Sequence, residues 1–183
     1  MWCCLVGSEM CIRDSATTAG TCPVMGTAST MACIAETLGM ALPGTAAIPA
    51  VHADRLRAAE ESGKRAVEIA RSGLTPDKVV TEKSVENALR VLLAIGGSTN
   101  GIIHLTAIAG RAGVNVSLDR LNEISDETPV LVNLKPSGDH YMEEFFAGGG
   151  LGAVLREIEH LLHLDTLSIL SLIHISEPTR QHH

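Results

Sequence analysis

Only one stretch of this chain, PVLVNL at 129–134, is compact, apolar and β-branched in the way that buried strands are. Elsewhere the apolar residues recur every three to four positions, which is the spacing of a helix. Because one strand cannot form a sheet alone, the pattern predicts an α/β fold represented by a helix-rich portion with few strands. Such a portion suits part of a larger domain better than a free-standing helix bundle. We expect helices from Thr27 or Ser29 to about Gly39, at 49–72, from Pro76, at 85–95, at 98–112, after Ser117, and from 141 to 162 with a break at 148–150.

The longest predicted helix, 49–72, has one apolar and one charged face and should end at Gly73. Its charged face offers two pairs spaced four apart, Glu60 with Lys64 and Glu61 with Arg65. Its apolar face is predicted to consist of Leu56, Ala59, Ala66, Val67, Ile69 and Ala70.

Composition excludes several classes of protein. Hydrophobic residues make up 45% of the chain but aromatic residues only 2%, so the core must be aliphatic. A net charge of −7 without a basic run argues against a nucleic-acid partner. No apolar run approaches the roughly 18 residues that cross a bilayer, and MWCCLVG at the start is a poor secretion signal. An acidic small substrate remains compatible, because local hydrogen-bond donors rather than net charge bind carboxylates.

The two ends of the chain carry short sequences that are related at the level of their codons. One legal codon choice for EMCIRDS at 9–15 has a reverse complement that translates as LSLIHIS at 170–176. An inverted-repeat DNA adaptor around an insert produces this relation, whereas folding does not. We therefore interpret 1–15 and 170–183 as adaptor-derived flanks and 16–169 as natural protein cut at both ends. We expect the flanks to pack poorly and the interior to expose apolar surface that the missing parts would cover.

Cys22 is the most specific candidate for a functional site. It lies in a Gly/Pro turn just before a helix N-terminus, where free amides and the helix dipole stabilise a thiolate. By spacing alone it is a nucleophile, a soft-metal ligand or an ordinary structural cysteine. Cys33, inside the helix, is predicted to fill the core. Only these two cysteines lie in 16–169, which favours a reducing cytoplasm over a disulfide framework.

Two further places could bind a substrate. Ser98, Thr99 and Asn100 follow Gly96-Gly97 at a helix start, where free amides suit a carboxylate, although capping explains them equally well. Lys135 and Ser137 leave the end of the predicted strand and could supply a cation and a hydroxyl, although a plain turn is the simpler interpretation. The glycines at 148–150 lack the Lys-Ser/Thr of a phosphate loop and are expected to break a helix. His52 and His104 are weaker candidates, because no histidine pair has zinc-site spacing.

Several of these motifs together resemble one known family. They are GTCPVMGTASTM with AETLGMALPG at 20–44, LTPDKVVT at 74–81, IGGSTNGIIHL at 95–105, and VNLKPSG to EEFFAGGG at 132–150. In this order they are similar to the iron–sulfur dehydratases of dihydroxy acids and sugar acids. The first matches every fixed position of that family's pattern G-x-C-x-x-M-x-T-A-x-T-M, and the resemblance covers 16–169.

The resemblance implies a hydro-lyase that converts a 2,3-dihydroxy carboxylic acid, either a branched-chain dihydroxy acid or an aldonic sugar acid, to a 2-keto acid. It implies an iron–sulfur cluster (2Fe–2S or 4Fe–4S) on three cysteines, a divalent metal, usually Mg²⁺, and a homo-oligomeric intact enzyme. Cys22 matches the third cluster cysteine. The other two cluster cysteines and the metal ligands beside them lie upstream in the family. A serine base and a glutamate metal ligand belong to a C-terminal barrel domain that this chain is expected to lack. The chain alone is therefore expected to be inactive, and CPVMGTASTM favours the sugar-acid branch.

Two rival interpretations stay open from the residues themselves. One is a non-enzymatic helical interaction or scaffold domain whose accessible cysteine is incidental. The other is a thiol enzyme in which Cys22 is the nucleophile and distant His52 or His104 serves as its base.

Overall fold

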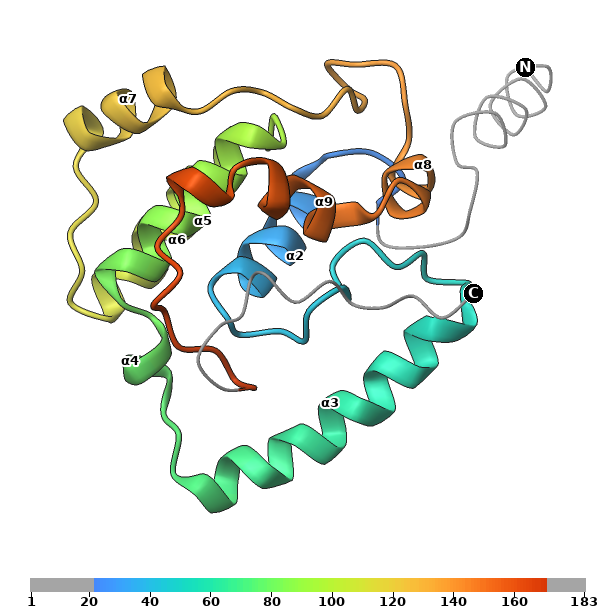
Figure 1. Cartoon of the computed structure of the whole chain (residues 1–183), viewed down its shortest axis with the longest axis vertical. Coiled ribbons are helices and arrows are strands. Elements are labelled where there is room, and N and C mark those ends of the chain that lie inside the picture. Colours follow the sequence, from blue (N-terminus) through green and yellow to red (C-terminus); the bar gives the residue numbers. More distant parts are fainter. Residues whose placement is uncertain (1–21, 171–183) are drawn as a thin grey trace, which may run out of the picture.

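Three helices, α2 (Thr27–Thr37), α5 (Glu82–Ala94) and α6 (Thr99–Arg111), pack on one another at the centre of the fold. The computed structural model describes residues 22–170 (Figure 1). Around this centre lie α4 (Pro76–Val79), α7 (Leu118–Glu127), α8 (Met142–Ala147), α9 (Gly150–Glu157) and a 3₁₀ turn (Glu159–Leu161), while α3 (Ala53–Ser72) runs along one edge. No helix among residues 22–170 is long and apolar enough to span a bilayer.

Helix α5 is the central element because it is buried on two sides. Its N-terminus is fixed by a capping box in which Thr81 Oγ1 accepts from the Ser84 amide and Ser84 Oγ accepts from the Thr81 amide. One side packs into a cluster with α2, α6 and α7, and the other into a cluster with α9 and the turn before α2. The first cluster includes Ile34, Val85, Leu89, Leu92, Leu105 and Ile124, and the second includes Cys33, Val91, Ile95, Leu151, Val154 and Ile158.

Glycines let α6 approach α2 and α5 closely. A Cβ atom on Gly101 would lie 2.8 Å from Leu92 Cδ1 and 3.0 Å from Thr30 Cγ2. A Cβ atom on Gly97 would lie 2.8 Å from Thr30 Cγ2. The GGSTNG segment is therefore a packing junction as well as a helix start.

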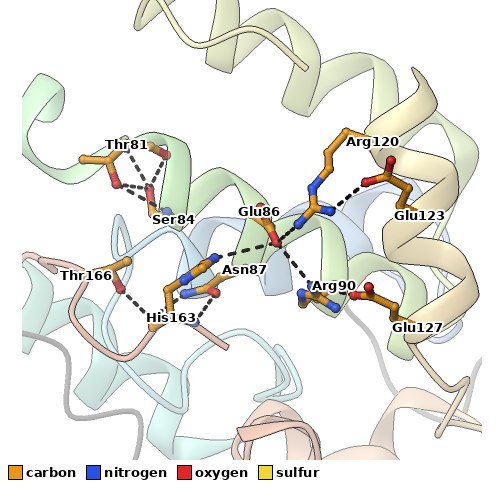
Figure 2. A network of polar contacts seen from close by, with 10 residues as sticks. All are labelled: Thr81, Ser84, Glu86, Asn87, Arg90, Arg120, Glu123, Glu127, His163 and Thr166. Atoms are coloured by element: carbon orange, nitrogen blue, oxygen red, sulfur yellow. Dashed lines mark hydrogen bonds and ion pairs between the residues drawn. The ribbon is translucent and has the colours of Figure 1, made fainter. Parts of the chain in front are cut away.

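A network of charged and polar side chains joins α5 to α7 and to the segment after α9 (Figure 2). Glu86 Oε1 lies 2.7 Å from Arg120 Nη2 and 3.2 Å from Arg90 Nη2, and Arg90 Nη2 lies 2.9 Å from Glu127. Burial raises the pKa of Glu86, but the hydrogen bond and charge of Arg120 and the hydrogen bond of Arg90 outweigh it and lower that pKa below its ordinary value. The Glu86 carboxylate therefore ties α5 to α7.

The predicted helices at 85–95 and 98–112 and the short helix from Pro76 are confirmed, as is the Ser117 cap, whose Oγ accepts from the Arg120 amide. The break at 148–150 is also confirmed, since Gly149 and Gly150 have positive φ between α8 and α9. One predicted cap is wrong: α2 starts after Gly26, without a side-chain cap, and neither Thr27 nor Ser29 is its N-cap.

The predicted start of the long helix at Pro49 is wrong by four residues. His52 is the N-cap of α3, and its Nδ1 accepts from the Asp54 amide, while the His52 amide bonds the Pro49 carbonyl in a preceding turn. The end at Gly73, in the left-handed conformation, is confirmed. The Glu60–Lys64 pair forms at 2.8 Å, but Arg65 pairs with Glu68 and not with Glu61.

The predicted strand at 129–134 is wrong. Within residues 22–170 its one ladder contact is an isolated bridge between Leu134 and His140, and the Leu131 amide bonds the Ala94 carbonyl at the end of α5. No neighbouring strand lies beside it in the described part of the chain, and a strand needs a partner for its backbone groups. The prediction of a helix-rich structure with few strands is nevertheless confirmed.

Leu56, Leu118 and Val130 are each more than half exposed. That missing parts of the protein cover such apolar residues stays a prediction. The predictions for the two flanks concern residues 1–15 and 170–183. All of these lie outside the described residues except Leu170, which is exposed.

Candidate functional site

The turn that carries Cys22 is held in place from two sides. The Met25 amide donates to the Lys135 carbonyl and the Met142 amide donates to the Pro23 carbonyl, each at 2.8 Å. The half-buried Cys22 thiol donates to the Val24 carbonyl at 3.1 Å. These bonds hold the Cys22 turn, and with it the sulfur, just before the start of α2.

Gly26 leaves room for this sulfur. A Cβ atom at position 26 would lie 3.1 Å from Cys22 Sγ, closer than a side chain normally approaches. The glycine between Met25 and Thr27 therefore keeps the thiol free on the side that faces the start of α2.

Hydroxyl and amide groups at the starts of α2 and α6 meet beside this turn. Thr27 Oγ1 lies 3.0 Å from Ser98 Oγ and accepts from Asn100 Nδ2 at 3.1 Å. The Ser98 amide donates to Thr30 Oγ1 at 3.0 Å. Ser98 and Asn100 are thus brought together as predicted candidates, whereas Thr99 is exposed and takes no part in these bonds. Two adjacent helix N-termini and three polar side chains form a surface suited to a carboxylate.

Sequence reasoning missed Thr27 and Thr30 as members of this cluster. Local spacing suggested only a cap for Thr27, and its contact with Ser98 spans 71 positions of the chain. The repeated hydroxyl residues in GTAST were the one signal in the sequence.

Lys135 contacts the Cys22 turn through its backbone carbonyl, which accepts from the Met25 amide, and it contacts Tyr141 through its side chain. Its Nζ donates to Tyr141 Oη at 2.6 Å and lies 4.0 Å from the centre of the Tyr141 ring. Ser137, two residues on, is exposed. The structure therefore brings Lys135 to the Cys22 turn but gives Ser137 no comparable position.

A small cavity of about 120 Å³ opens beside Cys22. Its polar walls come from Ser29 on α2, Arg55 on α3 and Glu143 on α8, none of which was predicted as a site residue. A larger, mainly apolar cavity of about 430 Å³ lies between 131–134 and the α8–α9 pair, and Cys22 is not part of its lining. Of these two cavities, the smaller one is therefore the one that Cys22 lines.

The other titratable candidates have structural roles. Cys33 is fully buried, as predicted, and burial followed by the nearby Glu36 charge raises the pKa of its thiol to about 12. Glu36 accepts from the Gly44 and Ala46 amides, at 2.7 Å each, and so holds the loop after α2. His52 caps α3 and packs edge-on against Phe146, and His104 is exposed on α6.

Comparison with known proteins identifies the family. The family model described as dihydroxy-acid/6-phosphogluconate dehydratase N-terminal matches residues 8–173. The chain belongs to this family.

Named relatives agree with this assignment. The chain is 48% identical over 151 residues to the dihydroxy-acid dehydratase of Methanosarcina barkeri and 43% identical over 159 residues to that of Caldanaerobacter subterraneus subsp. tengcongensis. The matched regions cover 82% and 86% of this chain but only 27% and 29% of those relatives. Residues 22–170 thus represent a helix-rich portion of the dehydratase N-terminal domain.

The described residues of this dehydratase-family chain include one candidate metal ligand, Cys22. Cys22 is a half-accessible thiol at a helix N-terminus with room kept for it by Gly26, which suits one soft-metal ligand. Among residues 22–170, no group of three or more His, Cys, Asp or Glu side chains could hold a metal ion. A cluster at Cys22 therefore needs further ligands from outside residues 22–170.

Proposed function

We propose that this chain is the N-terminal part of an iron–sulfur hydro-lyase that dehydrates a 2,3-dihydroxy carboxylic acid to a 2-keto acid. The observation that carries the proposal is the Cys22 turn, where a family motif places an accessible thiol beside a small polar cavity. The name dihydroxy-acid dehydratase on the relatives supports a dihydroxy acid as the substrate class, and the family description leaves a sugar acid as the other.

The reaction removes the proton on C2 and the hydroxyl on C3 as one water, and the enol that forms tautomerises to the keto acid. The cluster, when bound, supplies a Lewis-acidic iron for the leaving hydroxyl, and Mg²⁺ offsets the charge of the substrate. Cys22 contributes one thiolate ligand to the cluster. The role proposed for Ser98, Asn100 and Thr27 is to hold the substrate carboxylate, since they meet at two helix N-termini.

Lys135 and Arg55 contribute two cations to this region, where Glu143 also lines the cavity. Arg55 lines the cavity beside Cys22, and Lys135 is held against Tyr141. Their proposed role is to attract and orient an anionic substrate before the reaction. Thr99 and Ser137, both exposed, are retained as weaker substrate-contact candidates.

The isolated 183-residue chain is proposed to be inactive, and the intact protein to be a cytoplasmic homo-oligomer without a nucleic-acid or membrane partner. The incomplete ligand group among residues 22–170 supports the inactivity. Product formation above a protein-free blank by the purified, iron-loaded chain would contradict it.

The test uses the intact protein that contains this sequence, reconstituted with iron and sulfide without oxygen. Cys22→Ser should lower bound iron and labile sulfide and the visible cluster absorbance, and should abolish keto-acid formation. Cys33→Ala is the matched control, because Cys33 is buried in the core and should leave the cluster intact. Equal cluster content in the native protein and Cys22→Ser would refute the role of Cys22.

An interaction domain is the second candidate function, favoured by the exposed apolar face of α3. It predicts that the intact protein takes up no cluster under any reconstitution condition while still associating through this helix. The third possibility, a thiol enzyme, has less support, because in the described residues the Cys22 thiol bonds the Val24 carbonyl and His52 contacts Asp54 and Phe146.

A further inference from the structure

One buried carboxylate on α2, that of Glu36, has no part in the proposed reaction. Glu36 is 9% exposed. Its Oε1 accepts from the Gly44 amide and its Oε2 from the Ala46 amide, each at 2.7 Å. No backbone carbonyl in the described part of the chain accepts from either amide. Because amides inside a protein need an acceptor, this turn depends on one side chain.

The loop that Glu36 holds, at 44–50, forms a wall of the small cavity beside Cys22. Residues 46–50 of this loop line the cavity, and α2 contributes Ser29 and Ala32 to the lining. Ser29, Ala32 and Glu36 recur at helical spacing, so they share one side of α2. Glu36 therefore lies about one turn beyond the cavity on the same side of the helix.

A second charged side chain holds the far end of this loop. Arg55 of α3 donates to the Ile48 carbonyl through Nη2, and Arg55 also lines the cavity. Between the two anchors Ala47 packs into the core. Residues 44–50 contain no helix or strand, so contacts with side chains outside the loop decide where it lies.

The chemistry of Glu36 matches this role. Burial raises the pKa of Glu36, and the hydrogen bonds from the Gly44, Ala46 and Thr45 amides offset only part of that increase. The carboxylate is therefore kept in the fold at a cost. A glutamine there would present one acceptor oxygen and one amide group, so it could not accept from both amides. Two acceptor oxygens on one side chain are what the loop requires.

We propose that Glu36 is a positioning residue for the Cys22 cavity: its carboxylate fixes the loop at 44–50 and thereby the size of the opening to the Cys22 thiol. Glu36 acts through the loop rather than on the reacting atoms. As a statement about catalysis the inference rests on the proposed function, whereas the opening of the cavity can be measured without it.

The first test measures access to Cys22 in the full 183-residue chain. Iodoacetamide and a fluorescein-linked maleimide are applied separately, and peptide mapping gives the rate of modification at each cysteine. The ratio of the two rates at Cys22 reports the size of the opening, because both reagents react with the same thiolate. Glu36→Gln should raise the maleimide-to-iodoacetamide ratio at least about fivefold, since losing a hydrogen bond to a charged group lets the loop open locally.

Cys33 separates a local change from general unfolding. It lies three residues before Glu36 on α2 and is fully buried, so it should stay unmodified in Glu36→Gln. Glu61→Gln removes the same charge at an exposed position of α3 and should keep the native ratio. An unchanged ratio in Glu36→Gln, with Cys33 protected, would overturn the proposal.

A milder variant decides the case in which Glu36→Gln also exposes Cys33. Glu36→Asp keeps the carboxylate but shortens the side chain by one methylene, so it should raise the ratio at Cys22 while Cys33 stays protected. Exposure of Cys33 in both variants would contradict the proposal, because Glu36 would then hold the whole fold rather than the cavity wall.

The second test uses the intact protein, reconstituted as for Cys22→Ser. Glu36→Gln should keep the native iron and sulfide content and raise KM several-fold with a smaller change in kcat, because a displaced wall weakens binding of substrate and transition state alike. A native KM would refute the role of Glu36 in the reaction. If Cys22→Ser keeps its cluster, the proposed function fails, whereas the labelling ratio in the 183-residue chain still decides whether Glu36 positions the cavity.

Discussion

Replacing Gly101 with alanine adds one methyl group at the point where α2, α5 and α6 meet. The new Cβ atom would lie 2.8 Å from Leu92 Cδ1, 3.0 Å from Thr30 Cγ2 and 3.3 Å from Ile34 Cδ1. Three side chains on two helices would have to move together. Overpacking of this kind costs about 1–3 kcal/mol, against a gain of about 1 kcal/mol from the better helix propensity of alanine.

Gly110→Ala on the same helix separates the two effects, because a Cβ atom there meets nothing within 4 Å. That variant should be more stable than the native chain by about 0.5–1 kcal/mol. The free energy of unfolding of Gly101→Ala should fall below that of Gly110→Ala by the packing cost alone, about 1–3 kcal/mol. Urea unfolding followed by circular dichroism measures both values. If the two variants are equally stable, α6 does not pack as tightly against α2 and α5 as the glycine contacts indicate.

Three other variants or treatments test separate parts of the structure. The folded pKa of Glu86 lies below 4.5, so the carboxylate contributes to the free energy of unfolding above that pH, and the contribution is lost as the pH falls through the lowered pKa. The difference in stability between the native chain and Glu86→Gln, measured by urea unfolding, should therefore close at acid pH. A difference that does not change with pH would contradict this. Asn87→Ala removes two 2.8 Å bonds with the His163 backbone and should cost about 2–4 kcal/mol by urea unfolding, whereas alanine at an exposed asparagine of α7 should cost little. In peptide mapping after iodoacetamide treatment, the half-accessible Cys22 should be modified and the buried Cys33, with a pKa of about 12, should be protected until the chain unfolds.

Helix positions in this chain follow from local sequence. The apolar spacing and the Thr81–Ser84 capping box determine α5, and the Ser117 cap determines where α7 starts. These features depend on residues within a few positions of one another, because a helix satisfies its backbone hydrogen bonds internally. The Cys22 candidate was equally accessible to sequence reasoning, since its turn and its helix start are adjacent in the chain.

The errors arose where a partner distant in sequence decides the outcome. The stretch 129–134 has the composition of a strand, but a strand forms only beside another, and none lies beside it among residues 22–170. The apolar spacing of α3 predicted which residues share a face but not where that face points, and Leu56 and Val67 lie exposed. Thr27 was assigned to a cap, whereas its hydroxyl meets Ser98 and Asn100.

By itself the sequence determined the helices, the aliphatic core, the motifs of the dehydratase family and the turn that carries Cys22, because each is encoded within a short run of residues. Only the tertiary structure decided that Thr27 joins Ser98 and Asn100, that Arg55 and Glu143 border the Cys22 cavity, and that α3 presents its apolar face outward. Spacing along the chain specifies which side chains share a face of one element. Which face meets another element depends on the packing of the whole chain, where contacts between distant residues compete for the same buried surface.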